Sequence, residues 1–176
     1  MSVTVAKTAG FCFGVRRAVE LAEEQAHEHG SIYAYGEIIH NMHEIERLEK
    51  MGVHTAHTIE EIPDGERVLI RAHGVPRAVY DAFRAKNCEI FDATCPFVHK
   101  IHRIVDEESR AGRLIVILGK EGHPEVEGIR GWCGESVVID GEQAAQTFAD
   151  AFNPADRPVS MVAQTTVNRT IWNISV

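Results

Sequence analysis

The feature that most limits what this chain can fold into is its alternation of short β-like runs with amphipathic helical patterns, which continues almost from end to end. Residues 15–29 place small apolar side chains on one helical stripe, and Gly30 follows as a helix-ending residue. Residues 114–118 are a continuous apolar run with the length of a buried strand. Such alternation is typical of parallel sheets joined by helical crossovers. We therefore predict an α/β fold with mainly parallel sheets and flanking helices.

The same patterns divide the chain into two similar lobes. The cycle of strand and helix restarts after Cys95, so we place the boundary there. We predict an N-terminal strand within residues 1–12, a first α/β lobe over residues 13–95 and a second over residues 96–176. Strands are expected at 3–5, 31–36, 67–72, 89–91, 114–118, 136–139 and 159–163, with helices beginning at Val15, His43, Pro76, Pro96, His123, Glu142 and Asn168.

Composition excludes two classes of partner. The net charge is −8, and no basic stripe interleaved with aromatic residues is present, which argues against a nucleic-acid surface. The longest apolar run, residues 114–118, is too short to cross a bilayer, so we expect no membrane partner. The first residues lack the charged head and long apolar stretch of a secretory signal. We therefore expect a cytoplasmic protein whose four cysteines stay reduced.

Two cysteines occupy matching positions between a β-like run and a helical pattern. Cys12 and Cys95 should both lie at helix N-termini, where unpaired N–H groups and the helix dipole favour a thiolate. Thiolates bind soft metals and iron–sulfur clusters. The alternative is that both are small buried hydrophobic residues. Cys88 and Cys133 lack this setting, and we interpret them as structural.

Three histidines lie in glycine-flanked loops between a strand and a helix: His40, His73 and His123. In open α/β sheets, ligands gather outside the carboxyl ends of the strands. We therefore expect these loops and both cysteine corners to face one edge of the molecule. Imidazole rings and free backbone N–H groups donate to phosphate oxygens, so the histidines predict an anion pocket that suits a diphosphate. The alternative for each histidine is a solvated polar side chain.

Two further residues could move protons at the same edge. Glu125 follows His123 by two residues, and a glutamic acid held protonated in a dry cleft is a competent proton donor. The alternative is an ordinary first-turn glutamate favoured by the helix dipole. Thr165 offers a hydroxyl group after the last strand, although threonine there is commonly a helix cap.

Six segments together closely resemble the 4-hydroxy-3-methylbut-2-enyl diphosphate reductases, also called the LytB family. The resemblance runs in order through essentially the whole chain. The segments are Gly10-Phe11-Cys12-Phe13-Gly14-Val15, His40-Asn41, Ala72-His73-Gly74-Val75, Asp92-Ala93-Thr94-Cys95-Pro96, Gly122-His123-Pro124-Glu125-Val126-Glu127-Gly128 and Gln164-Thr165-Thr166.

The resemblance implies an iron–sulfur oxidoreductase of the non-mevalonate (MEP) isoprenoid pathway. The substrate, 4-hydroxy-3-methylbut-2-enyl diphosphate, would lose its allylic hydroxyl by reduction to give isopentenyl and dimethylallyl diphosphates. The family holds a 4Fe-4S cluster with three cysteines, of which Cys12 and Cys95 would be two. Electrons would arrive singly from ferredoxin or flavodoxin.

The resemblance also assigns roles to the other candidate residues. His40, His73 and His123 would grip the diphosphate group of the substrate. Glu125 would be the catalytic proton donor, supplying protons through a network that includes Thr165.

Members of this family consist of three α/β lobes with pseudo-threefold symmetry around a central cluster. Their third lobe supplies the third cysteine, and the N-terminal strand packs on it. Because this sequence stops at Val176, we expect a second lobe that is C-terminally incomplete and a third cysteine ligand outside this chain. We therefore expect the activity in the parent protein and an inactive fragment.

Two alternatives from other classes remain open on the sequence alone. A zinc hydrolase could use His40, His73, His123 and Glu125, since imidazole and carboxylate also suit zinc, but no His-x-x-x-His or His-Glu-x-x-His pair is present. A non-catalytic subunit could instead have kept a diphosphate-binding pocket without the cluster.

Overall fold

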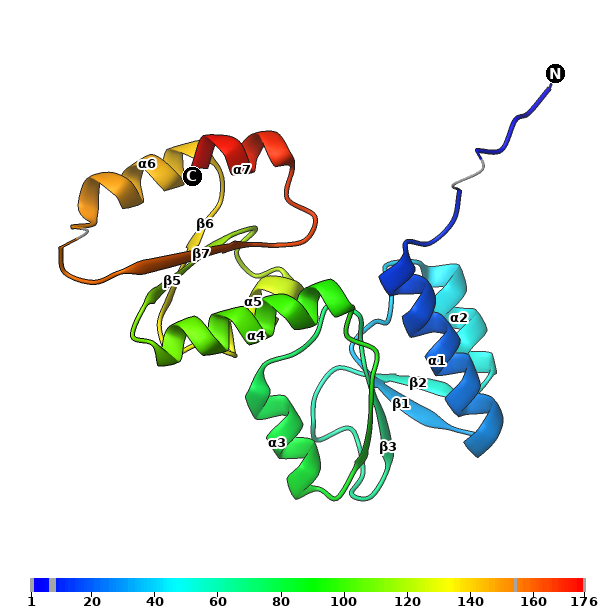
Figure 1. The fold of residues 1–176 in the computed structure, drawn as a ribbon. Helices are drawn as coiled ribbons and strands as arrows, with labels where there is room; N and C mark the ends of the chain where they lie inside the picture. Colours follow the sequence, from blue (N-terminus) through cyan, green and yellow to red (C-terminus); the bar gives the residue numbers. More distant parts are fainter. Residues whose placement is uncertain (1, 7–8, 154, 176) are drawn as a thin grey trace.

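The computed structural model describes residues 2–6, 9–153 and 155–175, and it shows an α/β protein with two parallel sheets (Figure 1). We call the elements around the first sheet the first lobe and those around the second sheet the second lobe. The first lobe comprises α1 (Phe13–His29), β1 (Ile32–Tyr35), α2 (Met42–Lys50), β2 (Val53–Ala56), β3 (Arg67–Ile70), α3 (Arg77–Ala85) and β4 (Glu89–Asp92). The second comprises α4 (Pro96–Arg110), β5 (Leu114–Leu118), α5 (Pro124–Arg130), β6 (Ser136–Ile139), α6 (Glu142–Ala151), β7 (Val159–Ala163) and α7 (Arg169–Ser175).

The first sheet has the strand order β2-β1-β3-β4, and every pairing in it is parallel. Helices α1 and α2 cover one face, and α3 covers the other (Figure 1). Helix α1 approaches the sheet closely because its buried stripe carries the small side chains of Ala18, Ala22 and Ala26. It ends where Gly30 adopts a left-handed conformation (φ 79°) and donates its N–H to the Ala26 carbonyl oxygen.

The second sheet has the order β6-β5-β7 and is also parallel. Its central strand β5 is buried along its whole length, as its continuous apolar sequence predicts. Helices α4 and α5 cover one face, and α6 and α7 lie over the other (Figure 1).

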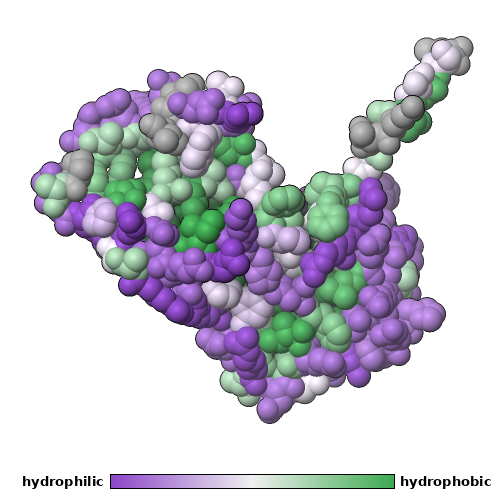
Figure 2. All heavy atoms as spheres, in the orientation of Figure 1, coloured by the Kyte–Doolittle hydropathy of each residue, from purple (hydrophilic) through white to green (hydrophobic). Residues whose placement is uncertain are grey.

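The face of the second sheet under α6 is packed less tightly. No residue of α6 is itself buried, and a cavity of about 280 Å³ lined by Val116, Ile139, Phe148 and other apolar residues lies between part of the helix and the sheet. Figure 2 shows hydrophobic residues visible from outside in this part of the second lobe. The two lobes therefore differ in how completely their cores are closed.

The end of α5 joins the second lobe to the first. The Trp132 indole Nε1 donates a hydrogen bond to the Val75 carbonyl oxygen at 2.9 Å. A Cβ atom on Gly131 would lie 2.5 Å from the Pro76 Cα atom, so only glycine permits this approach. The contact holds α5 beside the loop that follows β3.

Most of the predicted elements are confirmed to within a few residues, but one predicted strand is absent from the described residues and one observed strand was not predicted. The described residues of the segment 1–12 form no strand; residues 2–6 lead away from the body of the molecule (Figure 1), because no other strand pairs with them. Residues 1, 7 and 8 of that prediction lie outside the described residues. Strand β2 was not predicted, since Val53–Ala56 is a four-residue edge strand with little apolar pattern.

The predicted boundary between Cys95 and Pro96 falls between β4 and α4 and stays a prediction, as does a pseudo-threefold arrangement with a third lobe. No helix in the part of the chain that the structure describes combines the length and the apolar character needed to cross a membrane.

Candidate functional site

The two cysteines at the strand-to-helix corners line one cavity, as the sequence predicts. Cys12 is the residue before α1 and Cys95 the residue before α4, so both thiols lie at helix N-termini. The cavity, which we call the thiol cavity, has a volume of about 640 Å³ and is also lined by Thr165 and Thr166. Residues from both lobes therefore line the same cavity as the two thiols.

Gly14 and Arg17 on α1 hold the helix against the Cys95 corner. A Cβ atom on Gly14 would lie 2.7 Å from the Cys95 Sγ atom, so glycine is required for this contact. The Arg17 guanidinium donates to the carbonyl oxygens of Thr94 and Asp92, each at 3.1 Å. These bonds fix the first turn of α1 relative to the loop that carries Cys95.

The thiol cavity fits part of the ligand set that an iron–sulfur cluster needs. Two thiols face it, and its remaining walls are largely apolar, with Phe13, Phe97 and Ile101 among them. Within residues 2–6, 9–153 and 155–175, no three His, Cys, Asp or Glu side chains gather as a metal site. Two potential soft ligands therefore line one cavity. That they hold a cluster, and that a third ligand lies elsewhere, stay predictions.

The other two cysteines belong to the cores of the lobes. Cys88 packs beside the core under α3, and Cys133 packs beside the core under α4 and α5. Burial raises the pKa of the Cys133 thiol, which keeps that sulfur protonated. Their interpretation as structural residues agrees with these positions.

The three predicted histidines form one row. The ring centroids of His40 and His73 are 5.4 Å apart, and those of His73 and His123 are 5.5 Å apart. The backbone of α5 helps to bring them together, because a Cβ atom on Gly128 would touch the His73 carbonyl oxygen at 3.4 Å. The structure thus confirms that the loops converge; the binding role of each histidine stays a prediction.

His73 is neutral at pH 7 in this arrangement. Burial, followed by electrostatic repulsion from the neighbouring Arg71, His123 and His40, lowers its pKa from 6.5 to about 4. Its Nδ1 atom is buried and has no hydrogen-bond partner among the described residues. Such an atom is costly unless a ligand or water satisfies it.

His123 has a defined tautomer. The backbone N–H of Glu125 donates to its Nδ1 atom at 3.1 Å, so Nδ1 accepts and the proton of the neutral ring lies on Nε2. Nε2 is then a donor for an anionic ligand. His40 lies at the exposed end of the row, where its Nδ1 is 3.3 Å from the Glu37 carboxylate.

Glu125 connects the histidine row to the thiol cavity. Its carboxyl group is buried, with 2% of the residue exposed. It accepts hydrogen bonds from the Thr165 backbone N–H at 2.6 Å and from the Thr165 hydroxyl at 2.9 Å. Thr165 also lines the thiol cavity, so the Glu125 carboxyl group is linked to that cavity through Thr165, while the Glu125 backbone N–H contacts His123.

Sequence reasoning missed Arg71, a cation beneath the histidine row. It follows β3, and its guanidinium lies so close to Gly36 that a Cβ atom there would be 2.4 Å from Nη1. Burial lowers its pKa, and its charge faces the His73 ring. The sequence signal that could have identified Arg71 is its position directly after a buried apolar strand.

Two other supporting residues were also missed or undervalued. Gln164 ties two loops together: its Oε1 accepts from the Lys120 N–H at 3.2 Å, and its Nε2 donates to the Thr166 hydroxyl at 2.8 Å. His102 is buried at 1% exposure and stacks on Trp132, with ring centroids 5.2 Å apart. No local pattern distinguishes His102 from a solvated histidine on an amphipathic helix.

Comparison with known proteins gives a consistent picture. The family model described as LytB protein matches residues 3–174. A protein of Clostridioides difficile named 4-hydroxy-3-methylbut-2-enyl diphosphate reductase is 41% identical over 173 residues, which cover 98% of this chain and 61% of that protein. One of the same name from Aquifex aeolicus is 39% identical and is matched over 58% of its length, with 96% of this chain covered.

Solved structures match the fold as well. The E-1-hydroxy-2-methyl-but-2-enyl-4-diphosphate reductase of Plasmodium falciparum superposes with a TM-score of 0.87 at 28% identity, covering 96% of this chain and 53% of that one. A structure of (E)-4-hydroxy-3-methyl-but-2-enyl diphosphate reductase, described as the terminal enzyme of the non-mevalonate pathway, matches with a TM-score of 0.83 at 38% identity, covering 99% and 62%.

This chain spans about 60% of the length of the curated relatives that it matches. Neither alternative function gains support from these findings. The similar proteins are named as reductases, and the described residues contain no group of three potential zinc ligands.

Proposed function

This chain belongs to the LytB family, and on that premise we propose that the protein reduces 4-hydroxy-3-methylbut-2-enyl diphosphate to isopentenyl and dimethylallyl diphosphates. In this reaction, the allylic C–O bond breaks and a C–H bond forms. Two electrons and two protons enter, and the hydroxyl oxygen leaves as water. The site must therefore hold a diphosphate, deliver protons and pass electrons.

One observation carries the proposal: the path that links the thiol cavity, Thr165, Glu125 and the histidine row. It places a proton-carrying carboxyl group between a cavity with two soft metal ligands and a cluster of anion-binding rings. Neither a zinc hydrolase nor a simple anion-binding protein requires this combination.

The histidine row and Arg71 supply the diphosphate-binding half of the site. His123 offers its Nε2–H, and the unpartnered Nδ1 of His73 becomes a second donor once the ring is protonated. The negative charge of a bound diphosphate favours that protonation, since it opposes the burial and cationic repulsion that lower the pKa of His73.

Glu125 and Thr165 supply the proton-delivering half. A protonated Glu125 carboxyl can pass its proton to the Thr165 hydroxyl, which in turn donates its own proton toward the thiol cavity. The bond from the Thr165 backbone N–H holds the carboxyl in place for this exchange. The low exposure of Glu125 keeps bulk water from competing.

Cys12 and Cys95 would hold two irons of a 4Fe-4S cluster, which when bound supplies single electrons and a Lewis-acidic iron beside the substrate hydroxyl. We propose a ferredoxin or flavodoxin as the electron source. We also propose a cytoplasmic location, where the free thiols would stay reduced.

Because we expect the 176-residue chain alone to be inactive, the test uses the parent protein that also contains the third lobe. This protein is purified anaerobically and given the substrate with dithionite as reductant, and phosphorus NMR then identifies the diphosphates. We expect isopentenyl and dimethylallyl diphosphates together with an oxygen-sensitive brown chromophore. Release of inorganic phosphate would point to a hydrolase, and unchanged substrate would contradict the reductase proposal.

A further inference from the structure

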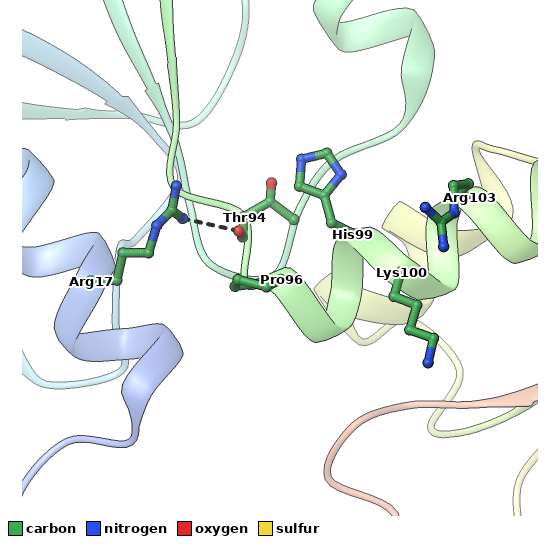
Figure 3. Close-up of a pocket in the computed structure, with 6 residues that line it drawn as sticks. All are labelled: Arg17, Thr94, Pro96, His99, Lys100 and Arg103. Carbon is green, nitrogen blue, oxygen red and sulfur yellow. Dashed lines mark hydrogen bonds between the residues drawn. The ribbon is translucent and has the colours of Figure 1, made fainter.

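A second pocket, on the surface beside the Cys95 corner, is lined by cations. Figure 3 shows its lining side chains, which come from α1, from the loop before α4 and from the first half of α4. The volume of the pocket is about 460 Å³. Four of its lining side chains carry or can carry positive charge, and none is acidic. We call it the basic pocket; its lining residues are Arg17, Thr94, Pro96, His99, Lys100 and Arg103.

The positive charge of this pocket stands out on a chain whose net charge is −8. Arg17 donates to two backbone carbonyl oxygens, so no carboxylate cancels its charge there. The ion pair between Arg103 and Glu107 is long, at 3.7 Å, and both side chains are about two-thirds exposed. His99 alone has a close carboxylate, the Asp92 group at 3.0 Å. The pocket therefore keeps a local positive field.

The basic pocket adjoins the thiol cavity. Cys95 lies between Thr94 and Pro96, which both line the basic pocket, while the Cys95 thiol faces the thiol cavity. Lys100 lines both spaces. A protein bound over the basic pocket would therefore cover the residues on either side of Cys95.

We propose that the basic pocket is the docking site for a small acidic protein that carries one electron at a time. This inference rests on the proposed function, because that reaction consumes two electrons that no residue of this chain supplies. Each docking event would oxidise one carrier molecule and reduce the site by one electron, so one turnover requires two events. Complementary charge steers such encounters, and electron-transfer interfaces are characteristically small and short-lived.

Binding is the first test. A ferredoxin of strongly negative net charge would be titrated into the protein, with Lys100→Glu as the test variant and Lys50→Glu as its matched control. Both lysines are exposed and helical, and Lys50 lies in the last turn of α2, on an element that does not line the pocket. We expect Lys100→Glu to weaken binding about tenfold and Lys50→Glu less than about twofold. Binding should also weaken as salt rises from roughly 0.05 to 0.2 M. Equal losses in the two variants would overturn the proposal.

Turnover rates with two reductants distinguish a failure of the docking proposal from a failure of the proposed function. Arg103 lines the basic pocket but not the thiol cavity, and its side chain is 71% exposed, so Arg103→Glu should fold normally. We expect this variant to keep the rate supported by dithionite and to lose most of the rate supported by ferredoxin. Equal ferredoxin-driven rates in variant and parent would overturn the docking site. Both rates are measured in the protein that also contains the third lobe. If dithionite supported no turnover in that protein without the substitution, the proposed function itself would fail.

Inorganic pyrophosphate tests the competing interpretation that the pocket holds a small anion. We expect the Kd of pyrophosphate, measured by calorimetry, to be the same in Arg103→Glu as in the parent, because its site is the histidine row. A large loss of pyrophosphate affinity in Arg103→Glu, with ferredoxin binding unchanged, would make the pocket an anion site and overturn the proposal.

Discussion

The two lobes have the same layered plan but are closed to different degrees. In the first lobe, α1 and α2 on one face and α3 on the other bury the sheet completely enough that Val68, Leu69 and Ile70 are all inaccessible to solvent. In the second, only the α4 and α5 face is closed to that degree, and no residue of α6 is itself buried. Local opening requires less free energy where fewer apolar contacts are lost. The second lobe should therefore be the more easily opened of the two.

This difference coincides with a division of labour in the candidate site. The first lobe contributes His40, His73 and Cys12, which we assign to binding of the diphosphate and the cluster. The second lobe adds His123 to the diphosphate-binding row, and it alone contributes Glu125 and Thr165, which we assign to proton delivery. A ligand that spans both sets would hold the lobes together. The predictions below test this division from its largest expected effect to its smallest.

Glu125→Gln should impair proton delivery and leave diphosphate binding intact. The amide keeps the shape of the side chain but cannot supply the proton, so we expect turnover to fall about 10²–10⁴-fold while diphosphate affinity survives. The matched control is Glu127→Gln on the same helix, where the carboxylate is 46% exposed. Steady-state kinetics and pyrophosphate calorimetry measure the two effects. Unchanged turnover in Glu125→Gln would remove this residue from the mechanism.

Replacing one phenylalanine in each lobe by alanine should reveal the difference in packing between the two lobes. Phe83 on α3 is fully buried, so Phe83→Ala should lower the free energy of unfolding by about 3–5 kcal/mol. Phe148 on α6 is only partly buried and borders a cavity, so Phe148→Ala should cost about 1 kcal/mol. Urea unfolding followed by circular dichroism gives both values. Equal losses would mean that the second lobe is closed as tightly as the first.

Acid should destabilise the fold through two buried histidines. Burial is the main cause that lowers the pKa of both His73 and His102 to about 4, against 6.5 for an ordinary histidine. Between these values the unfolded chain binds more protons than the folded one, so the free energy of unfolding should decrease as the pH falls from 6.5 to 4. Urea midpoints across this range measure the effect. His73→Asn should flatten the slope, whereas the exposed His54→Asn should not.

The sequence predicts the elements that both lobes share, because core contacts impose a period on the residues that make them. Helix α1 and strand β5 show this clearly, since one carries a stripe of small residues and the other an unbroken apolar run. In contrast, the described structure has no strand at residues 3–5, where the sequence predicts one. Alternation of Val3 and Val5 favours an extended chain, but a strand also needs a partner, which local sequence does not reveal.

The site was predictable where a residue sits at a strand-to-helix corner, since parallel strands bring their carboxyl ends to one edge. This rule found both thiols, the histidine row and Thr165. It could not find His102, whose burial depends on the packing of α4 against Trp132 and Gly74. Nor could it foresee the open face under α6, because an amphipathic pattern shows that a helix has an apolar side and not how fully that side is covered.

The proposed function depends most on Cys12 and Cys95 binding one cofactor together. The most direct measurement is the iron and acid-labile sulfide content of anaerobically purified protein, compared among single cysteine-to-serine variants. We expect Cys12→Ser and Cys95→Ser each to lose most of the iron and sulfide, with Cys88→Ser and Cys133→Ser retaining both. Equal iron and sulfide in all four variants, or zinc in place of iron in the parent, would contradict the account.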